Sequence, residues 1–140
     1  YFHGLIPLLT ILIKDNEDIT SLFFMENDFL VSSFRFVNQP SFENIEVLED
    51  ATLLVLNYDD VLKMYKDHPE VNYLGRVMIE LNYYRIYHRL VSMLKFSARE
   101  RYEVLMKSQP ELFQRVPLTH IASYLGIKKE SLSRIRKSLV

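Results

Sequence analysis

The chain has 140 residues, which is enough for one ordinary domain or two small ones. A hydrophobic content of 49% with 25% charged residues is typical of a folded globular protein. The sequence has no cysteine, which excludes disulfides, thiolate zinc sites and cysteine nucleophiles. This absence fits a reducing compartment, so we expect a cytoplasmic protein. No apolar run reaches the roughly 20 residues that a membrane helix needs, so we expect no membrane partner.

The charge is unevenly distributed along the chain. Residues 1–60 carry eleven acidic and two basic side chains, whereas residues 61–140 carry seven acidic and fifteen basic ones. A basic half of this kind favours a polyanion as partner. The alternative is a chance distribution of solvated charges.

Residues 1–56 have the pattern of short strands. Apolar runs of β-forming residues alternate with polar turn segments, which predicts hairpins in a sandwich or barrel. The runs are "LLTILI", "ITSLFF", "NIEVL" and "ATLLVL". The phenylalanines of this half are expected to pack in its core. They are Phe23, Phe24, Phe29, Phe34, Phe36 and Phe42.

From Asn57 the pattern changes to helix, with Asn57 as the expected N-cap. Pro69 suits the first turn of a long helix that continues to about Lys95. Its side chains at heptad spacing form a seam, which either packs on the chain's own domain or dimerises as a coiled coil. We expect a homodimer. The seam residues are Leu74, Val77, Leu81, Tyr84, His88 and Val91.

The segment "SARE" at residues 97–100 has the pattern of a capping box, because Ser97 and Glu100 can cap each other's backbone amides. It predicts a new helix from Ser97 to about Ser108, with a domain boundary near Phe96. Pro110 opens a further short helix.

The residues of several enzyme chemistries are missing. Three glycines cannot build a phosphate loop or a dinucleotide fingerprint, and four dispersed histidines do not predict a metal site. No nucleophile motif of the G-x-S-x-G type occurs. We therefore expect no enzyme activity, no metal and no cofactor.

The segment "PLTHIASYLGIKKESLSRIRKSLV" predicts two helices joined by a tight turn. The first helix has an apolar face, and Gly126 after it supplies the left-handed backbone that ends a helix. Ala122 is small enough for a close helix crossing, and Ile127 fills the corner. The apolar face of the first helix consists of Leu118, Ile121, Ala122 and Leu125, and that of the second consists of Leu132, Ile135 and Leu139.

The second helix is basic, with five bases and one acid from Lys128 to Val140. This combination favours a helix-turn-helix whose second helix enters the major groove of DNA. The alternative is a basic amphipathic helix that only packs. The candidate DNA-binding residues are Lys128, Lys129, Glu130, Ser131, Ser133, Arg134 and Lys137.

"RVPLTHIASYLGIKKESLSRIRKSL" resembles the C-terminal helix-turn-helix of the Crp/Fnr regulators, and of the Bacteroidetes type in particular. "SARERYEVLMKSQPEL" and "VLEDATLLVLNYDDVLKMY" extend this resemblance upstream. In this family the base-reading residues fall on Lys129, Glu130 and Arg134, and Ser131 matches a phosphate-contacting hydroxyl. Lys129 replaces an arginine of the family and lacks the guanidinium fork that grips guanine.

The resemblance implies an α+β fold. Its parts are an antiparallel, jelly-roll-like β-roll incomplete at its N-terminus, a dimerisation helix and a winged helix-turn-helix. The expected domains are 1–68 for part of a cyclic-nucleotide-binding-like sensor, 69–96 for the dimerisation helix and 97–140 for DNA binding. The expected function is a transcription regulator that reads a pseudo-palindromic operator as a dimer. The competing hypothesis is a ligand-sensing or protein-interaction module whose helix-turn-helix no longer reads DNA.

The sensor half departs from the family's nucleotide-binding pattern. Residues 31–33 ("VSS") stand near the family's Gly-Glu pair, and Ser41 stands near its phosphate-binding arginine. A cyclic phosphate in such a pocket would lack a counter-charge, which is costly. We therefore do not expect cyclic AMP as ligand, and any small-molecule effector is unknown.

Overall fold

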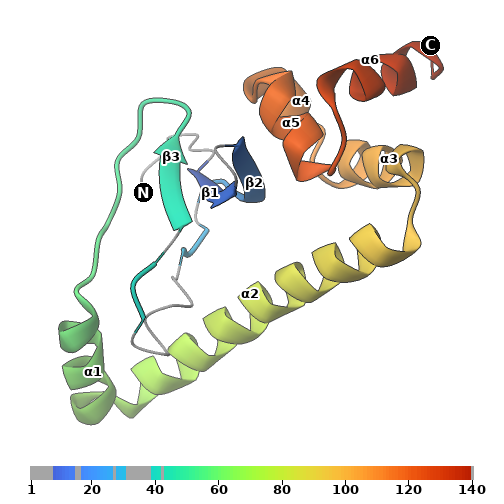
Figure 1. The fold of residues 1–140 in the computed structure, drawn as a ribbon. Helices are drawn as coiled ribbons and strands as arrows, with labels where there is room; N and C mark the ends of the chain where they lie inside the picture. The colour runs from blue at the N-terminus through green and yellow to red at the C-terminus, as the bar shows by residue number, and fades with distance from the viewer. Residues whose placement is uncertain (1–7, 15–16, 27, 31–38, 42, 140) are drawn as a thin grey trace. The chain divides into compact units, whose positions relative to one another are not determined.

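A computed structural model describes residues 8–14, 17–26, 28–30, 39–41 and 43–139, and Figure 1 shows its fold. The described residues form three strands, β1 (Leu8–Lys14), β2 (Glu17–Phe24) and β3 (Glu43–Val47). They also form six helices, α1 (Tyr58–Asp67), α2 (Pro69–Lys95), α3 (Ala98–Ser108), α4 (Leu112–Arg115), α5 (Leu118–Tyr124) and α6 (Lys129–Lys137).

The three strands form one antiparallel sheet with β1 in the centre and the strand order β2-β1-β3. Leu8 pairs with Phe24 on one side and with Val47 on the other. The register between β1 and β2 shifts between Thr10 and Ile11, which marks a β-bulge or a similar irregularity. Three of the four strand-like runs in the sequence therefore correspond to strands.

The predicted fold class is wrong. Helices predominate in the described part of the chain, and its strands form one three-stranded sheet instead of a β-roll. The fourth run, at residues 51–56, forms no strand, and Leu54 in it is 90% exposed. A strand is defined by the pairing of its backbone, so β-forming residues without a partner strand stay irregular. The described residues contain no strand after α6, which ends at Lys137, and they end at Leu139.

The helix starts follow the local sequence signals. The Asn57 side chain accepts a hydrogen bond from the Asp59 amide at 2.9 Å and so caps α1. Both halves of the predicted capping box are present at the start of α3. Ser97 Oγ accepts from the Glu100 amide, and the Glu100 carboxylate accepts from the Ser97 amide at 2.7 Å. The Glu100 pKa is lowered, because the Ser97 side chain and backbone stabilise the carboxylate.

The chain divides into two compact units, one of Tyr1–Ala51 with Val91–Val140 and the other of Thr52–Leu90. The second unit contains α1 and most of α2. There the Asn72 side chain donates from Nδ2 to the Tyr65 carbonyl at 2.6 Å. This division groups the sheet with the C-terminal helices, whereas the expected boundaries at residues 68 and 96 separate them. The expected domains remain a prediction.

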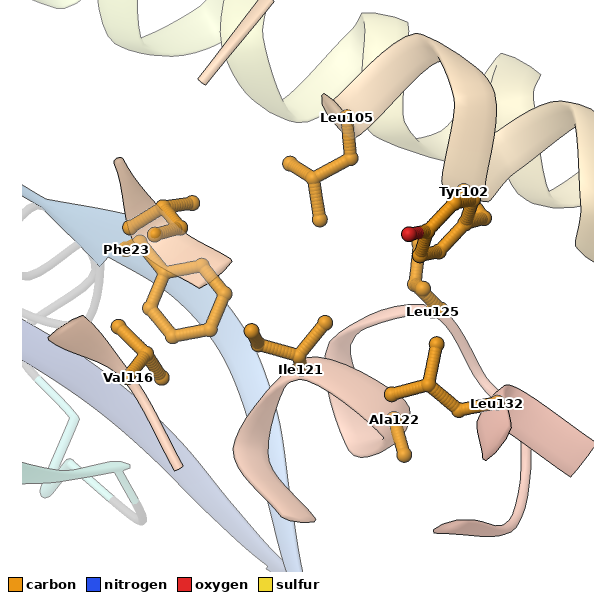
Figure 2. Close-up of a cluster of buried hydrophobic side chains, with 9 residues drawn as sticks. Phe23, Tyr102, Leu105, Val116, Ile121, Ala122, Leu125 and Leu132 are labelled. Carbon is orange, nitrogen blue, oxygen red and sulfur yellow. The ribbon is translucent and has the colours of Figure 1, made fainter. Parts of the chain in front are cut away.

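The core of the first unit lies among α3, α4, α5, α6 and the end of β2, and Figure 2 shows most of its side chains. Ile121 of α5 and Leu132 of α6 are completely buried. Phe23 of β2 joins them as a full member of this core. The core consists of Phe23, Tyr102, Leu105, Leu112, Val116, Ile121, Ala122, Leu125 and Leu132.

The expectation that the phenylalanines of the N-terminal half are buried is met in part. Phe23 and Phe24 are buried, whereas Phe29 is half exposed. The other three (Phe34, Phe36 and Phe42) lie outside the described residues.

Candidate nucleic-acid interface

The turn between α5 and α6 is built as the sequence predicts. Gly126 has a φ of 66°, in the left-handed region where a side chain is strained. Its amide donates to the Ser123 carbonyl at 2.9 Å, and the Ile127 amide donates to the Ala122 carbonyl at 3.0 Å. This pair of bonds is the Schellman motif, which satisfies the carbonyl groups at the end of α5.

The apolar faces of the two helices meet as expected at all but one position. Ile121 and Ala122 of α5 and its C-cap Leu125 are buried in one core with Leu132 of α6, and Figure 2 labels these four side chains. The exception is Leu139, which lies beyond the end of α6. Leu118, Ile127 and Ile135 pack on the same core.

The start of α6 has no side-chain cap. Lys128 occupies the N-cap position, and its side chain makes no capping hydrogen bond. The first backbone amides of α6 therefore lack the side-chain hydrogen-bond acceptor that a serine or threonine at the N-cap would provide. Free amides at a helix N-terminus attract anions, so this end of α6 can donate hydrogen bonds to a phosphate oxygen.

Six of the seven candidate DNA-binding residues lie in α6, and the seventh, Lys128, is its N-cap. Lys129 and Ser133 are four residues apart, as are Glu130 and Arg134, so these pairs share a helix face. The Arg134 guanidinium donates to Ser131 Oγ at 3.3 Å. Five of the seven are exposed (Lys128, Lys129, Glu130, Arg134 and Lys137), and two are half-buried (Ser131 and Ser133).

Arg136 is an exposed cation in the last turn of α6 that the sequence prediction omitted from the basic face. The signal was present in the charge count, because Arg136 is one of the five bases after residue 127.

All six seam residues lie on α2, which is continuous from Pro69 to Lys95. Leu74, Leu81 and Tyr84 expose half or more of their surfaces, and His88 is exposed as well. The Tyr84 and His88 rings lie 4.1 Å apart between centroids. Val77 and Val91 are half-buried. The structure thus leaves most of the seam accessible within the described residues.

The sheet contacts the first helix of the pair, which the sequence did not predict. The Thr20 amide of β2 donates to Ser123 Oγ of α5 at 2.9 Å. The Phe23 and Tyr124 rings pack with their centroids 5.0 Å apart. These contacts join residues about a hundred positions apart along the chain, and no local pattern in the sequence marks them.

A second link between the sheet segment and the C-terminal helices is ionic. Arg115, at the end of α4, donates to both carboxylate oxygens of Glu49, at 3.2 and 2.8 Å. Glu26 lies 3.6 Å from the same guanidinium. The Arg115 side chain is only 13% exposed, and its hydrogen bond lowers the Glu49 pKa below the usual value of 4.5.

The expected ligand region is described only in part. Residues 31–33 lie outside the described residues, whereas Ser41 is exposed and its Oγ accepts from the Glu43 amide at 3.0 Å. Across the described ranges no group of three or more His, Asp or Glu side chains could hold a metal ion. No helix in those ranges is long and apolar enough to cross a membrane.

Neither the scan of protein-family models nor the search of curated proteins found a match.

Proposed function

We propose that this protein is a sequence-specific DNA-binding regulator whose α6 enters the major groove. The observation that carries the proposal is the exposed basic face of α6, which follows a Schellman turn from a buried α5. A helix needs both properties to read DNA, because its apolar side must be held by the protein while its polar side reaches the bases.

The side chains of this face divide by chemistry. Arg134 and Lys129 can donate to guanine, and Glu130 can accept from cytosine. Lys128 and the uncapped amides at the start of α6 suit the phosphate backbone. Arg136 and Lys137, at the other end of the helix, add charge that neutralises phosphates.

A dimer is the second part of the proposal. The exposed leucine and tyrosine side chains at heptad spacing on α2 support pairing with a second copy of the chain. Two copies would place their α6 helices in successive major grooves about 34 Å apart on a pseudo-palindromic site. A monomer in sedimentation at micromolar concentration would remove this part.

The first experiment selects bound sequences from a random duplex pool and then titrates the selected site against salt. If three cations of each protomer contact phosphates, the slope of log K against log salt is about −5. Weak binding without a salt slope would contradict DNA binding. That result would favour a ligand-sensing or protein-interaction module instead.

The second experiment replaces one proposed reader. Arg134→Ala should weaken binding to the selected site by about 1–3 kcal/mol and relax base preference at one position. Arg99→Ala is the matched control, because Arg99 is an exposed arginine that pairs with Glu103 on α3. Full preference for the selected site over random DNA in Arg134→Ala would show that Arg134 is not a reader.

A further inference from the structure

One arginine outside the basic face joins the ends of two helices. Arg101 lies in α3, and its Nε donates to the Leu125 carbonyl at 3.0 Å while its Nη1 donates to the Phe96 carbonyl at 2.5 Å. Leu125 is the C-cap of α5, and Phe96 directly follows the last residue of α2. A single guanidinium thus binds a carbonyl at the carboxyl end of each helix.

The charge of Arg101 suits this place. The last carbonyl groups of a helix have no partner within the helix, and they carry the negative end of its dipole. A guanidinium has donors in a fixed planar fork, so it can satisfy two acceptors in different directions at once. A lysine ammonium would keep the charge but lose the fixed geometry between the two carbonyl groups.

A packing contact lies at the same junction. A Cβ atom built on Gly126 would lie 2.5 Å from Met93 Cε, so the last turn of α2 packs directly on the glycine turn. Met93, Phe96, Arg101 and Gly126 all belong to one compact unit. Val91, the last residue of the proposed dimer seam, belongs to that unit as well.

We propose that Arg101 is a positioning residue that sets the orientation of the α5–α6 pair on the last turn of α2. This inference rests on the proposed function. If the chain dimerises through α2, we expect the orientation at this junction to affect the separation of the two α6 helices. Arg101 lies in α3, outside the proposed reading helix, so we expect it to affect which spacing between half-sites the dimer accepts.

The test uses the full chain and three kinds of duplex. One carries the selected site, others carry the same half-sites with one or two base pairs inserted or removed, and the last carries a single half-site. Arg101→Gln should lower the preference for the natural spacing about tenfold, within the usual range of coupling between sites. Its affinity for the single half-site should stay within about twofold, because the α6 face is unchanged.

Two further variants control the experiment. Arg99→Gln removes an exposed arginine of the same helix whose partner is Glu103, and it should keep the wild-type spacing preference. Arg101→Lys keeps the charge without the fork and should show an intermediate loss. It also tests the proposal if Arg101→Gln does not fold.

The outcomes separate this inference from the proposed function. If wild-type protein binds no duplex, both the proposed function and this inference are wrong. If wild-type protein prefers one spacing and both Arg101 variants keep that preference, only the positioning role is overturned. An equal loss on the single half-site and on the spaced sites would also overturn it, because that pattern indicates general destabilisation.

Discussion

Replacing Gly126 by alanine tests the turn on which the candidate interface depends. The alanine would adopt a φ of 66°, which costs an L-residue with a Cβ about 1–2 kcal/mol. Its Cβ would also meet Met93 Cε at 2.5 Å. Met93 is 39% exposed and flexible, so moving its terminal methyl should cost under about 1 kcal/mol. We expect a loss of about 2 kcal/mol in the free energy of unfolding.

Thermal unfolding, monitored by circular dichroism, measures the change in Tm. For a chain of this size a loss of 2 kcal/mol lowers the Tm by about 8 °C. Two further variants separate the contributions. Gly126→Asn tolerates the left-handed backbone and should lose less, whereas Gly126→Ala combined with Met93→Ala removes the clash and keeps the backbone strain. An unchanged Tm for Gly126→Ala would refute both the backbone argument and the packing argument.

Two other predictions concern carboxylate contacts that the structure shows. Ser97→Ala removes the cap of α3 and should lower the free energy of unfolding in urea at neutral pH by about 1 kcal/mol. Ser108→Ala is the control, and a loss for Ser97→Ala that is no larger than the control's would contradict the capping role. The Glu49 pKa is lowered in the folded protein, so the stabilisation by this carboxylate is present above pH 4.5 and is lost as the pH falls through the lowered value. Glu49→Gln should therefore be less stable than wild type at neutral pH, and the difference should shrink in acid. A difference that stays constant below pH 4.5 would mean that pairing with Arg115 does not stabilise the fold.

The fold class shows the limit of reasoning from local β-propensity. Three strand-like runs form strands, but the run at residues 51–56 is also rich in apolar β-forming residues and forms none. Apolar β-branched and leucine residues favour a strand only when a partner backbone is at hand. A local pattern carries no information about which backbone lies alongside, so it could not predict the number of strands or that they form one three-stranded sheet.

The helix pair shows the opposite case. Gly126 in the left-handed region, the buried face of α5 and the exposed basic face of α6 were all predictable, because each depends on residues within about one or two helical turns. The missing side-chain cap at the start of α6 was predictable as well, because lysine at position 128 has no side-chain acceptor. Leu139 departs from the pattern because α6 ends at Lys137, and helix ends are the least certain part of such a prediction.

The sequence by itself determined the helix starts at Asn57 and Ser97, the glycine turn and the basic face, because these depend on side-chain chemistry and on short-range backbone hydrogen bonds. Only the tertiary structure placed Phe23 in the core of the C-terminal helices and paired Arg115 with Glu49. It alone also brought the carbonyl groups of Phe96 and Leu125 to one guanidinium. Such contacts form between segments far apart in the chain, and the packing of the whole unit fixes them rather than any local pattern.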